Sequence, residues 1–187
     1  MSFAAAPTNI PYDLKGVRIL VVEDFPFMAQ LMSAMLREFN VGFVLSVCDV
    51  ANAKRIIEEH NNSDEPMDAI DLLLTDLFPP RNEGLDLLKW IRNHDSEAIK
   101  YMPSLLCSAL TTQEVVESGR DFGANEIMVK PVSAEKLAQR ILYIIDHPRS
   151  FIEAPKFFGP DRRRKKTPYH GDERRVTSLE DIKVEQE

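Results

Sequence analysis

The chain has 187 residues, of which 44% are hydrophobic and 28% are charged, as is ordinary for a soluble globular protein. Its net charge is −7, and it is unevenly spread: residues 1–160 carry −8, residues 161–175 carry +4 and residues 176–187 carry −3. An acidic body does not suit binding to nucleic-acid phosphates, although the basic cluster could support it locally. Because no apolar run approaches the roughly 20 residues of a membrane span and no cleavable leader is recognisable, we expect a cytoplasmic protein.

The two cysteines, Cys48 and Cys107, each follow a short, mostly apolar run. A free cysteine in such a setting usually behaves as a small buried hydrophobic residue. We therefore predict two buried free thiols and no disulfide, which fits a reducing compartment.

Residues 1–13 show no hydrophobic period, so we predict a flexible lead-in. Residues 17–22 predict a strand that ends at two adjacent carboxylates, Glu23 and Asp24. Pro26 suits the first turn of a helix, because its missing N–H would have no partner there. Apolar residues then recur at helical spacing, and we interpret this methionine-rich stripe as core: Phe27, Met28, Leu31, Met32, Met35, Leu36 and Phe39.

Residues 43–47 predict a second strand, and Asp49 is placed to cap a helix that runs to about His60. The polar residues 61–66 predict a surface loop. A third strand follows, whose apolar residues are continuous rather than alternating, as is typical of a parallel strand covered on both faces: Ile70, Leu72, Leu73 and Leu74.

Asp76 lies just past this third strand, and Pro79, Pro80, Asn82 and Gly84 indicate a loop behind it. Ligands of open α/β sheets bind at the carboxyl ends of the strands, which makes Asp76 a candidate site residue. This stretch alone also allows an aspartate that merely caps a loop.

The rest of the regular pattern repeats the alternation of strand and helix. A helix follows Gly84, and its Trp90 is expected to pack rather than to bind a partner. Residues 103–107 and 126–130 predict two more strands. Their helices begin at Thr111 or Thr112 and at Ser133 and end near Gly123 and about Asp146. Five strands, each followed by a helix, predict an α/β fold with a parallel sheet and helices on both faces.

Four of the five predicted strand ends carry polar groups: Glu23 with Asp24, then Asp76, Ser108 and Lys130. Three carboxylates at one edge repel one another, and a divalent cation is the usual relief. Oxygen ligands without histidine or cysteine favour Mg²⁺ over Zn²⁺. A lysine can pair with a carboxylate and then with phosphoryl oxygens, and a serine hydroxyl can donate to them. The set predicts phosphoryl transfer onto an aspartate.

These motifs together resemble the response-regulator receiver domain of two-component signalling, close in style to the CheY type. The resemblance rests on Val21–Met28, on Thr75–Asp76 with Pro80 and Gly84 beyond, on Ser108–Ala109 and on Lys130–Pro131. It covers roughly residues 14–147. It implies a flavodoxin-like, doubly wound (βα)5 fold, with a five-stranded parallel sheet in the strand order 2-1-3-4-5.

The resemblance also implies a role for each acidic residue. Asp76 would be the phosphoacceptor. Asp24 would bind Mg²⁺ directly and Glu23 through water, and Asp76 and the backbone carbonyl of Phe78 would complete the protein ligands.

The remaining site residues would act on the phosphoryl group. Ser108 would swing toward it and Lys130 would bridge it, with a cis-favouring bond before Pro131 orienting the lysine loop. Phosphorylation would then shift a population between two arrangements of the face formed by the fourth helix, fifth strand and fifth helix, which is also a possible homodimer surface.

Two positions depart from the family pattern. The family often has an aromatic residue three positions before the lysine, where this chain has Ile127, so we expect an output face without an aromatic switch. Phe78 stands where a smaller polar residue is common. With Leu110, it could screen the acyl phosphate from water, and we predict a long-lived phosphorylated form.

Residues 148–187 form a C-terminal extension in which the hydrophobic period stops, and we expect it to be basic and partly disordered. It is too short for a familiar DNA-binding output domain. Phe151, Phe157 and Phe158 could fold back on the receiver or dock on a partner. The run Arg162–Lys166 could contact an acidic surface, although a solvated charge run is the simpler interpretation.

We therefore expect a phosphoacceptor signalling protein rather than an enzyme. It would take phosphate from a histidine kinase or phosphotransfer protein and act by contact with an unknown downstream protein. Two alternatives stay open from the sequence: a nucleic-acid-binding regulator that uses the basic tail, and a receiver that never takes phosphate. A phosphatase is disfavoured, because Phe78 occupies the position of a general acid.

Overall fold

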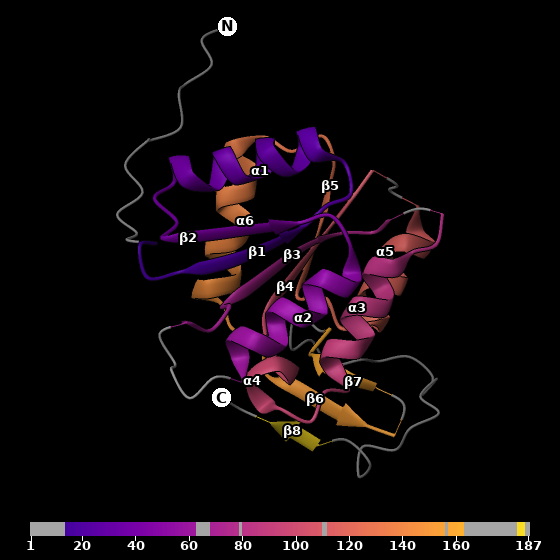
Figure 1. Cartoon of the computed structure of the whole chain (residues 1–187). Helices are drawn as coiled ribbons and strands as arrows, with labels where there is room; N and C mark the ends of the chain where they lie inside the picture. The colour runs from indigo at the N-terminus through magenta and orange to yellow at the C-terminus, as the bar shows by residue number, and fades with distance from the viewer. Residues whose placement is uncertain are drawn as a thin grey trace, which may run out of the picture.

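A five-stranded parallel sheet forms the centre of the computed structural model, which describes residues 14–62, 68–78, 80–109, 112–155, 157–162 and 183–185 (Figure 1). The spatial order is β2-β1-β3-β4-β5, which confirms the predicted fold class and strand order. The strands are β1 (Arg18–Val22), β2 (Phe43–Val47), β3 (Leu72–Asp76), β4 (Ser104–Ser108) and β5 (Glu126–Val129).

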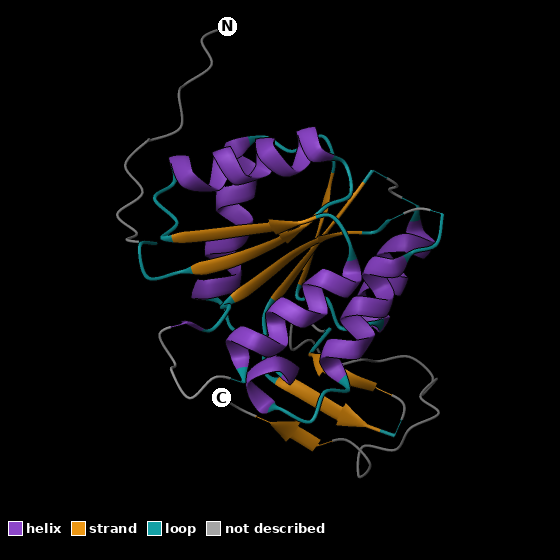
Figure 2. Ribbon diagram, viewed as in Figure 1, coloured by secondary structure: helices purple, strands orange, loops and turns teal. Residues whose placement is uncertain are grey.

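Helices cover both faces of this sheet, as predicted (Figure 2). On one face, α1 (Pro26–Glu38) and α6 (Ala134–Asp146) pack on a core that includes Ile19, Leu74 and Leu105. On the other face, α2 (Val50–Asn61), α3 (Glu83–Arg92) and α5 (Gln113–Asp121) pack around Leu20 and Leu73. Because both sides of the sheet are covered, β3 and β4 are buried along their whole length, which explains their continuous apolar sequence.

The predicted helix starts are confirmed by their caps. The side chains of Asp49, Thr112 and Ser133 each accept a hydrogen bond from the backbone N–H three residues on. Pro26 is in the first turn of α1. Thr111, the alternative start of α5, lies outside the described residues.

Two expectations were wrong, and one helix was not predicted. A short helix, α4 (Glu97–Lys100), precedes β4 and was missed, because four residues are too few to show a helical period. Phe27 and Leu31 of α1 are exposed rather than core, since the apolar stripe of this helix is wider than the face that the sheet can bury. Cys48 is exposed, because it follows β2 at the edge of the sheet, whereas Cys107 in central β4 is buried as predicted.

The C-terminal extension contains strands, which the sequence analysis did not predict. β6 (Phe151–Ala154) and β7 (Phe157–Pro160) pair as an antiparallel hairpin, and β8 (Lys183–Glu185) joins the other edge of β6. This small sheet lies at the bottom of Figure 1. Strands of three and four residues carry too little alternation to be recognised in a sequence.

The extension packs against the rest of the chain through Phe151, which is buried. Of the two possibilities given for its aromatic residues, the structure shows the one in which they fold back on the receiver. The boundary placed between residues 147 and 148 stays a prediction. Residues 1–13 and the basic residues 163–166 lie outside the described residues. In the described part of the chain, none of the helices is long and apolar enough to cross a membrane.

Candidate functional site

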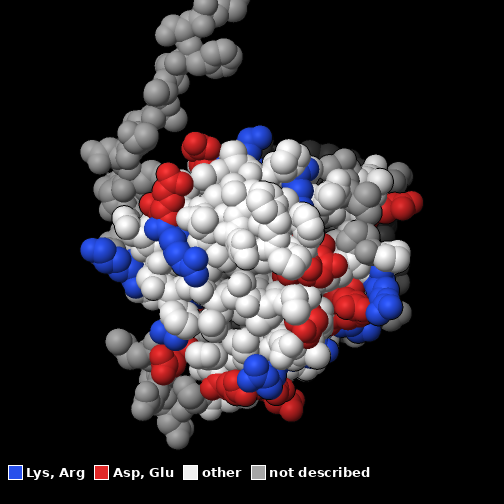
Figure 3. Space-filling view, turned by 45° about the horizontal axis from the view of Figure 1, so that its top comes forward, with Lys and Arg blue, Asp and Glu red and all other residues white. Residues whose placement is uncertain are grey.

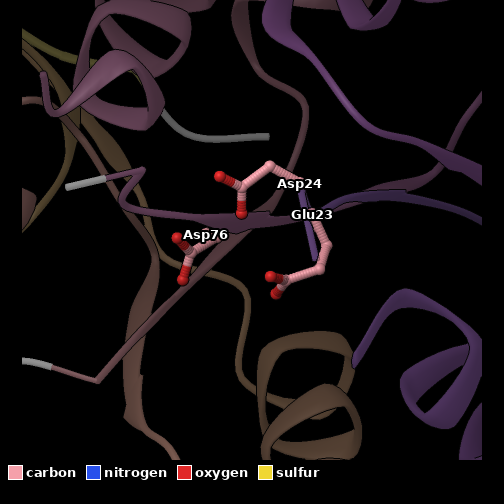
Figure 4. A group of neighbouring side chains, drawn as sticks. All are labelled: Glu23, Asp24 and Asp76. Carbon is pink, nitrogen blue, oxygen red and sulfur yellow. The ribbon is translucent and has the colours of Figure 1, made fainter. Parts of the chain in front are cut away.

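Three carboxylates meet at the edge of the sheet where the parallel strands end (Figure 4). Parallel pairing in register places Val22 of β1 beside Thr75 of β3, so Glu23, Asp24 and Asp76 follow at the same level. One carboxylate oxygen from each of the three lies within 4.8 Å of the others. Glu23 and Asp76 are buried, with 3% and 7% of their surface exposed, whereas Asp24 is open to solvent.

Lys130 reaches two of these carboxylates from the end of β5. Its Nζ lies 2.5 Å from Oε2 of Glu23 and 2.6 Å from Oδ1 of Asp76. The backbone N–H of Lys130 also donates to the carbonyl of Ser108 at 2.8 Å, and the bond from Lys130 to Pro131 is cis. The lysine is thus held from both its backbone and its side chain.

Burial and pairing shift the proton affinities of this group. Burial raises the pKa of the Glu23 carboxyl, although the hydrogen bond and the charge of Lys130 act in the opposite direction. Burial by itself would lower the pKa of Lys130, but its hydrogen bonds to Asp76 and Glu23 outweigh burial, and the pKa of Lys130 is raised. The ammonium group is therefore charged at neutral pH.

The loop after β3 fixes the other oxygen of Asp76. Oδ2 accepts a hydrogen bond from the backbone N–H of Phe78 at 2.7 Å. This geometry uses a left-handed backbone at Phe78, with φ of 58°, and a tight return of the loop beneath Asp76. A Cβ on Gly84 would lie 2.0 Å from the carbonyl oxygen of Asp76, so only glycine fits there. The two carboxylate oxygens of Asp76 consequently have different partners.

Ser108 lies on the strand next to β3. Asp76 is paired with Cys107 in the register of β3 and β4, so Ser108 is one residue beyond the partner of Asp76. It is buried, with 1% of its surface exposed. All of the predicted site residues therefore lie at one edge of the sheet: Glu23, Asp24, Asp76, Phe78, Ser108 and Lys130.

The side chain of Phe78 does not stand free above the acidic group. It is buried within the core cluster on the face covered by α2 and α3. Leu110, its predicted partner in screening the site, lies outside the described residues. Ile127 is half-buried and packs on the same core.

An apolar rim that the sequence analysis missed lies beside the acidic group. Phe25 and Phe27 are 58% and 62% exposed, their ring centroids are 6.2 Å apart, and Leu31 is also exposed. Figure 3 shows a broad uncharged surface on the side of the molecule where α1 lies. The signal was present in the sequence, because the apolar residues of α1 cover more positions than one buried face needs.

The cluster suits a hard cation. Its members are carboxylates, whose oxygens suit hard cations such as Mg²⁺ and Ca²⁺, and two of them are buried close enough to repel each other. A lysine at the same place adds a positive charge. Such an arrangement can bind and stabilise an anionic group next to a carboxylate nucleophile.

A family model, sequence relatives and solved structures all agree with the resemblance noted in the sequence. A model of the response regulator receiver domain matches residues 19–142. The chain is 28% identical to chemotaxis protein CheY-3 of Vibrio cholerae over 127 residues, which are 68% of this chain and 90% of that protein.

Solved structures are also similar. One is the receiver domain of a sensor histidine kinase from Pseudomonas aeruginosa PAO1, which has a magnesium ion coordinated in its active site cleft. It is 29% identical with a TM-score of 0.55, over 68% of this chain and 95% of that one. A putative response regulator from Chloroflexus aurantiacus shares the fold, with a TM-score of 0.59, 24% identity, and coverage of 70% and 98%.

Proposed function

The chain belongs to the response-regulator receiver domain family, and from this membership we propose that Asp76 accepts a phosphoryl group from a histidine kinase or a phosphotransfer protein. The observation that carries the proposal is the pairing of Lys130 with Asp76 inside a group of carboxylates at the ends of parallel strands. A loop-capping aspartate would need neither the lysine nor the two neighbouring acids.

The proposed reaction is a transfer between two proteins. An oxygen of Asp76 forms a bond to phosphorus as the phosphorus–nitrogen bond of a phosphohistidine breaks. The electron pair of that bond stays on the imidazole nitrogen, and Asp76 becomes an acyl phosphate. Oδ1 is the oxygen paired with Lys130 and Oδ2 is held by the N–H of Phe78, so the carboxylate is already oriented.

Glu23, Asp24 and Asp76, with the backbone carbonyl of Phe78, would hold Mg²⁺. Their donor atoms are oxygens, three of which lie close together, and this fits the ion. The magnesium seen in the similar receiver domain from P. aeruginosa supports the assignment. When bound, Mg²⁺ would offset the negative charge of the phosphoryl oxygens.

Lys130 and Ser108 would stabilise the phosphorylated aspartate. The ammonium group of Lys130 would move from Oδ1 of Asp76 to a phosphoryl oxygen, and the hydroxyl of Ser108 would donate to another. Both residues act at the ends of neighbouring strands, β4 and β5. The protein would catalyse only the transfer to itself and the later loss of its own phosphoryl group.

The apolar rim of Phe25, Phe27 and Leu31 would receive the phosphodonor. It borders Asp24, which is exposed, so a donor seated on it would bring a phosphohistidine next to the carboxylates.

The output face predicted from the sequence, made of the fourth helix, fifth strand and fifth helix, corresponds to α5, β5 and α6. This face would contact the downstream protein or a second copy, and it exposes Val129 and Ile145. Cys48 is a free, exposed thiol, which supports a cytoplasmic location.

Nucleic-acid binding through the tail has less support. Arg162, the one member of the basic run that the structure describes, already pairs with Asp121 at 2.6 Å and lies over the ring of Phe157. Its charge is therefore directed at the receiver.

The test is the intact mass of the protein after incubation with Mg²⁺ and phosphoramidate, beside Asp76→Asn. One added phosphoryl group on the wild type and none on the variant is the expected result. A folded wild type that gains no mass would overturn the proposal and leave a receiver that never takes phosphate.

A further inference from the structure

Three elements of the receiver run from the sheet edge that carries the candidate site toward the hairpin of β6 and β7, which lies at the bottom of Figure 1. β4 ends at Ser108 and begins at Ser104, and β5 leads to Lys130 and begins at Glu126. α5 ends at Asp121. The hairpin therefore lies at the other end of the receiver from the carboxylates, and it contacts the start of β5, the strand that leads to Lys130.

Two ion pairs flank the hairpin. Just before β6, Nη2 of Arg149 lies 2.7 Å from Oε1 of Glu126, whose side chain is only 2% exposed. Just after β7, Nη1 of Arg162 lies 2.6 Å from Oδ1 of Asp121. One pair fixes the start of β5 and the other fixes the end of α5.

Aromatic contacts lie between these two ion pairs. The ring of Tyr101 meets those of Phe151 and Phe158 at centroid distances of 4.8 and 5.3 Å. Nζ of Lys100 is 3.9 Å from the centroid of Phe158. The hairpin thus covers the chain between α4 and β4 as well as α5 and β5.

Arg92 connects the hairpin to the interior. Its guanidinium lies 5.1 Å from the ring centroid of Phe151 and donates to the carbonyl of Gly123, to Ser104 and to Asn125. These acceptors are at the start of β4 and immediately before β5. A shift of either strand would therefore move the acceptors of Arg92 and change its contact with Phe151.

The interface between the hairpin and the receiver is not completely filled. A cavity of about 650 Å³ lies between part of the hairpin and the ends of α3, α4 and α5, and polar side chains form much of its wall. The hairpin is consequently held by the two ion pairs and by the aromatic cluster around the buried Phe151, with a partly open, mostly polar gap beside them.

We propose that docking of this hairpin is coupled to the state of Asp76, an inference that rests on the proposed function. The docked hairpin coexists with a direct ion pair between Lys130 and Asp76. A phosphoryl group on Asp76 would change that pair, and β5 places only three residues between Lys130 and Glu126. In this proposal phosphorylation weakens docking, and by linkage weaker docking favours the phosphorylated state to the same degree.

The test measures binding in both directions on the full chain. The ligand is beryllofluoride with Mg²⁺, a reversible mimic of the phosphoryl group, so reciprocity applies to its affinity. The double variant Phe158→Ala with Arg162→Ala removes the contacts of the Phe158 ring with Tyr101 and Lys100 and the ion pair of Arg162 with Asp121. We expect it to bind beryllofluoride at least about fivefold more tightly than wild type, the lower end of typical couplings.

Two control variants separate the effect of hairpin docking from a general loss of protein stability. Phe158→Tyr keeps the ring, and Arg55→Ala removes a surface ion pair of α2, with Glu59, that is not among the hairpin contacts described above. Both should bind like wild type. In a second measurement, amide hydrogen exchange of residues 151–160 in the wild type should be faster with beryllofluoride than without it.

The outcomes are distinct. Tighter binding by the double variant, or faster exchange of the wild-type hairpin on binding, supports the coupling. Binding with unchanged affinity and unchanged exchange overturns the coupling and leaves the proposed function intact. If the wild type neither binds beryllofluoride nor takes phosphate from phosphoramidate, both proposals fail.

Discussion

Nζ of Lys130 lies 2.6 Å from Oδ1 of Asp76, so the proposed acceptor is held by the residue that would later hold its phosphoryl group. Replacing Lys130 with alanine removes a charge-assisted hydrogen bond from the developing phosphoryl charge. We expect the rate of phosphorylation by phosphoramidate to fall by about a hundredfold, as for the loss of one such donor elsewhere. Intact mass against time measures it, and Lys136→Ala, an exposed lysine of α6, is the control. An unchanged rate would remove Lys130 from the mechanism.

Gly84 must be a glycine because the backbone carbonyl of Asp76 lies against it. A methyl group there would overlap the carbonyl oxygen of Asp76, so the loop must move. We expect Gly84→Ala to lower the free energy of unfolding by about 1–3 kcal/mol, a usual range for forced overpacking, and to slow phosphorylation. Urea denaturation measures the first effect. Gly16→Ala is the matched control, since nothing lies within 4 Å of the position of its added Cβ.

Arg92 satisfies several buried oxygens at once. It donates to the carbonyls of Lys100, Met102 and Gly123, and burial lowers its pKa to about 9, which still leaves it charged at neutral pH. Arg92→Leu would leave these acceptors without their donor. We expect a loss of about 3–5 kcal/mol in the free energy of unfolding. Arg55→Leu on the exposed side of α2 should cost far less, and equal costs would contradict the assignment.

The two thiols should react very differently. Burial raises the pKa of Cys107 to about 12, so this thiol stays protonated and inaccessible at pH 8, whereas Cys48 is exposed. We expect iodoacetamide to add one group to the native protein and two to the unfolded chain, measured by mass. In Cys48→Ser the native protein should gain none.

The raised pKa of Cys107 makes the free energy of unfolding depend on pH. The pKa of Cys107 is higher in the folded protein than the ordinary value of 9.0, so its neutral form stabilises the fold fully below pH 9. This contribution is lost as the pH rises from 9 toward 12. Cys107→Ala should reduce the loss of stability over that interval in urea denaturation.

Phe78 offers a test of the lifetime of the phosphorylated form. Its side chain is buried and apolar, and we predict slow loss of the phosphoryl group in the wild type. Asparagine tolerates the left-handed backbone at this position, so Phe78→Asn keeps the loop conformation while it removes an apolar ring from the core, and urea denaturation must first show that the variant is folded. We expect several-fold faster loss of label after the phosphodonor is removed. Rapid loss from the wild type itself would reject the prediction.

Much of the fold and site could be predicted because the informative residues lie at strand ends. Asp76 follows a continuous apolar run, as is typical of a buried parallel strand, and Ser108 and Lys130 lie at the ends of the next two strands of the sheet. The partner atoms of Lys130 could not be predicted, because they depend on how the register of β1, β3 and β5 places three side chains that are far apart in the sequence.

The errors came from short or marginal patterns. Cys48 and Cys107 each follow an apolar run, but Cys48 lies just past β2 at the sheet edge, whereas Cys107 lies inside central β4. The hairpin of β6 and β7 depends on contacts with Tyr101 and Arg92 rather than on its own alternation. A short hairpin of this kind is stable only when something packs against it.

The small sheet gives the last described residues a structural role. β8 pairs with the edge of β6 that β7 leaves open, so β6 is a central strand only while residues 183–185 are present. Deleting them would turn β6 into an edge strand with unpaired amide and carbonyl groups. Such an edge can pair with a second chain, so shortening the protein at its C-terminus should promote self-association.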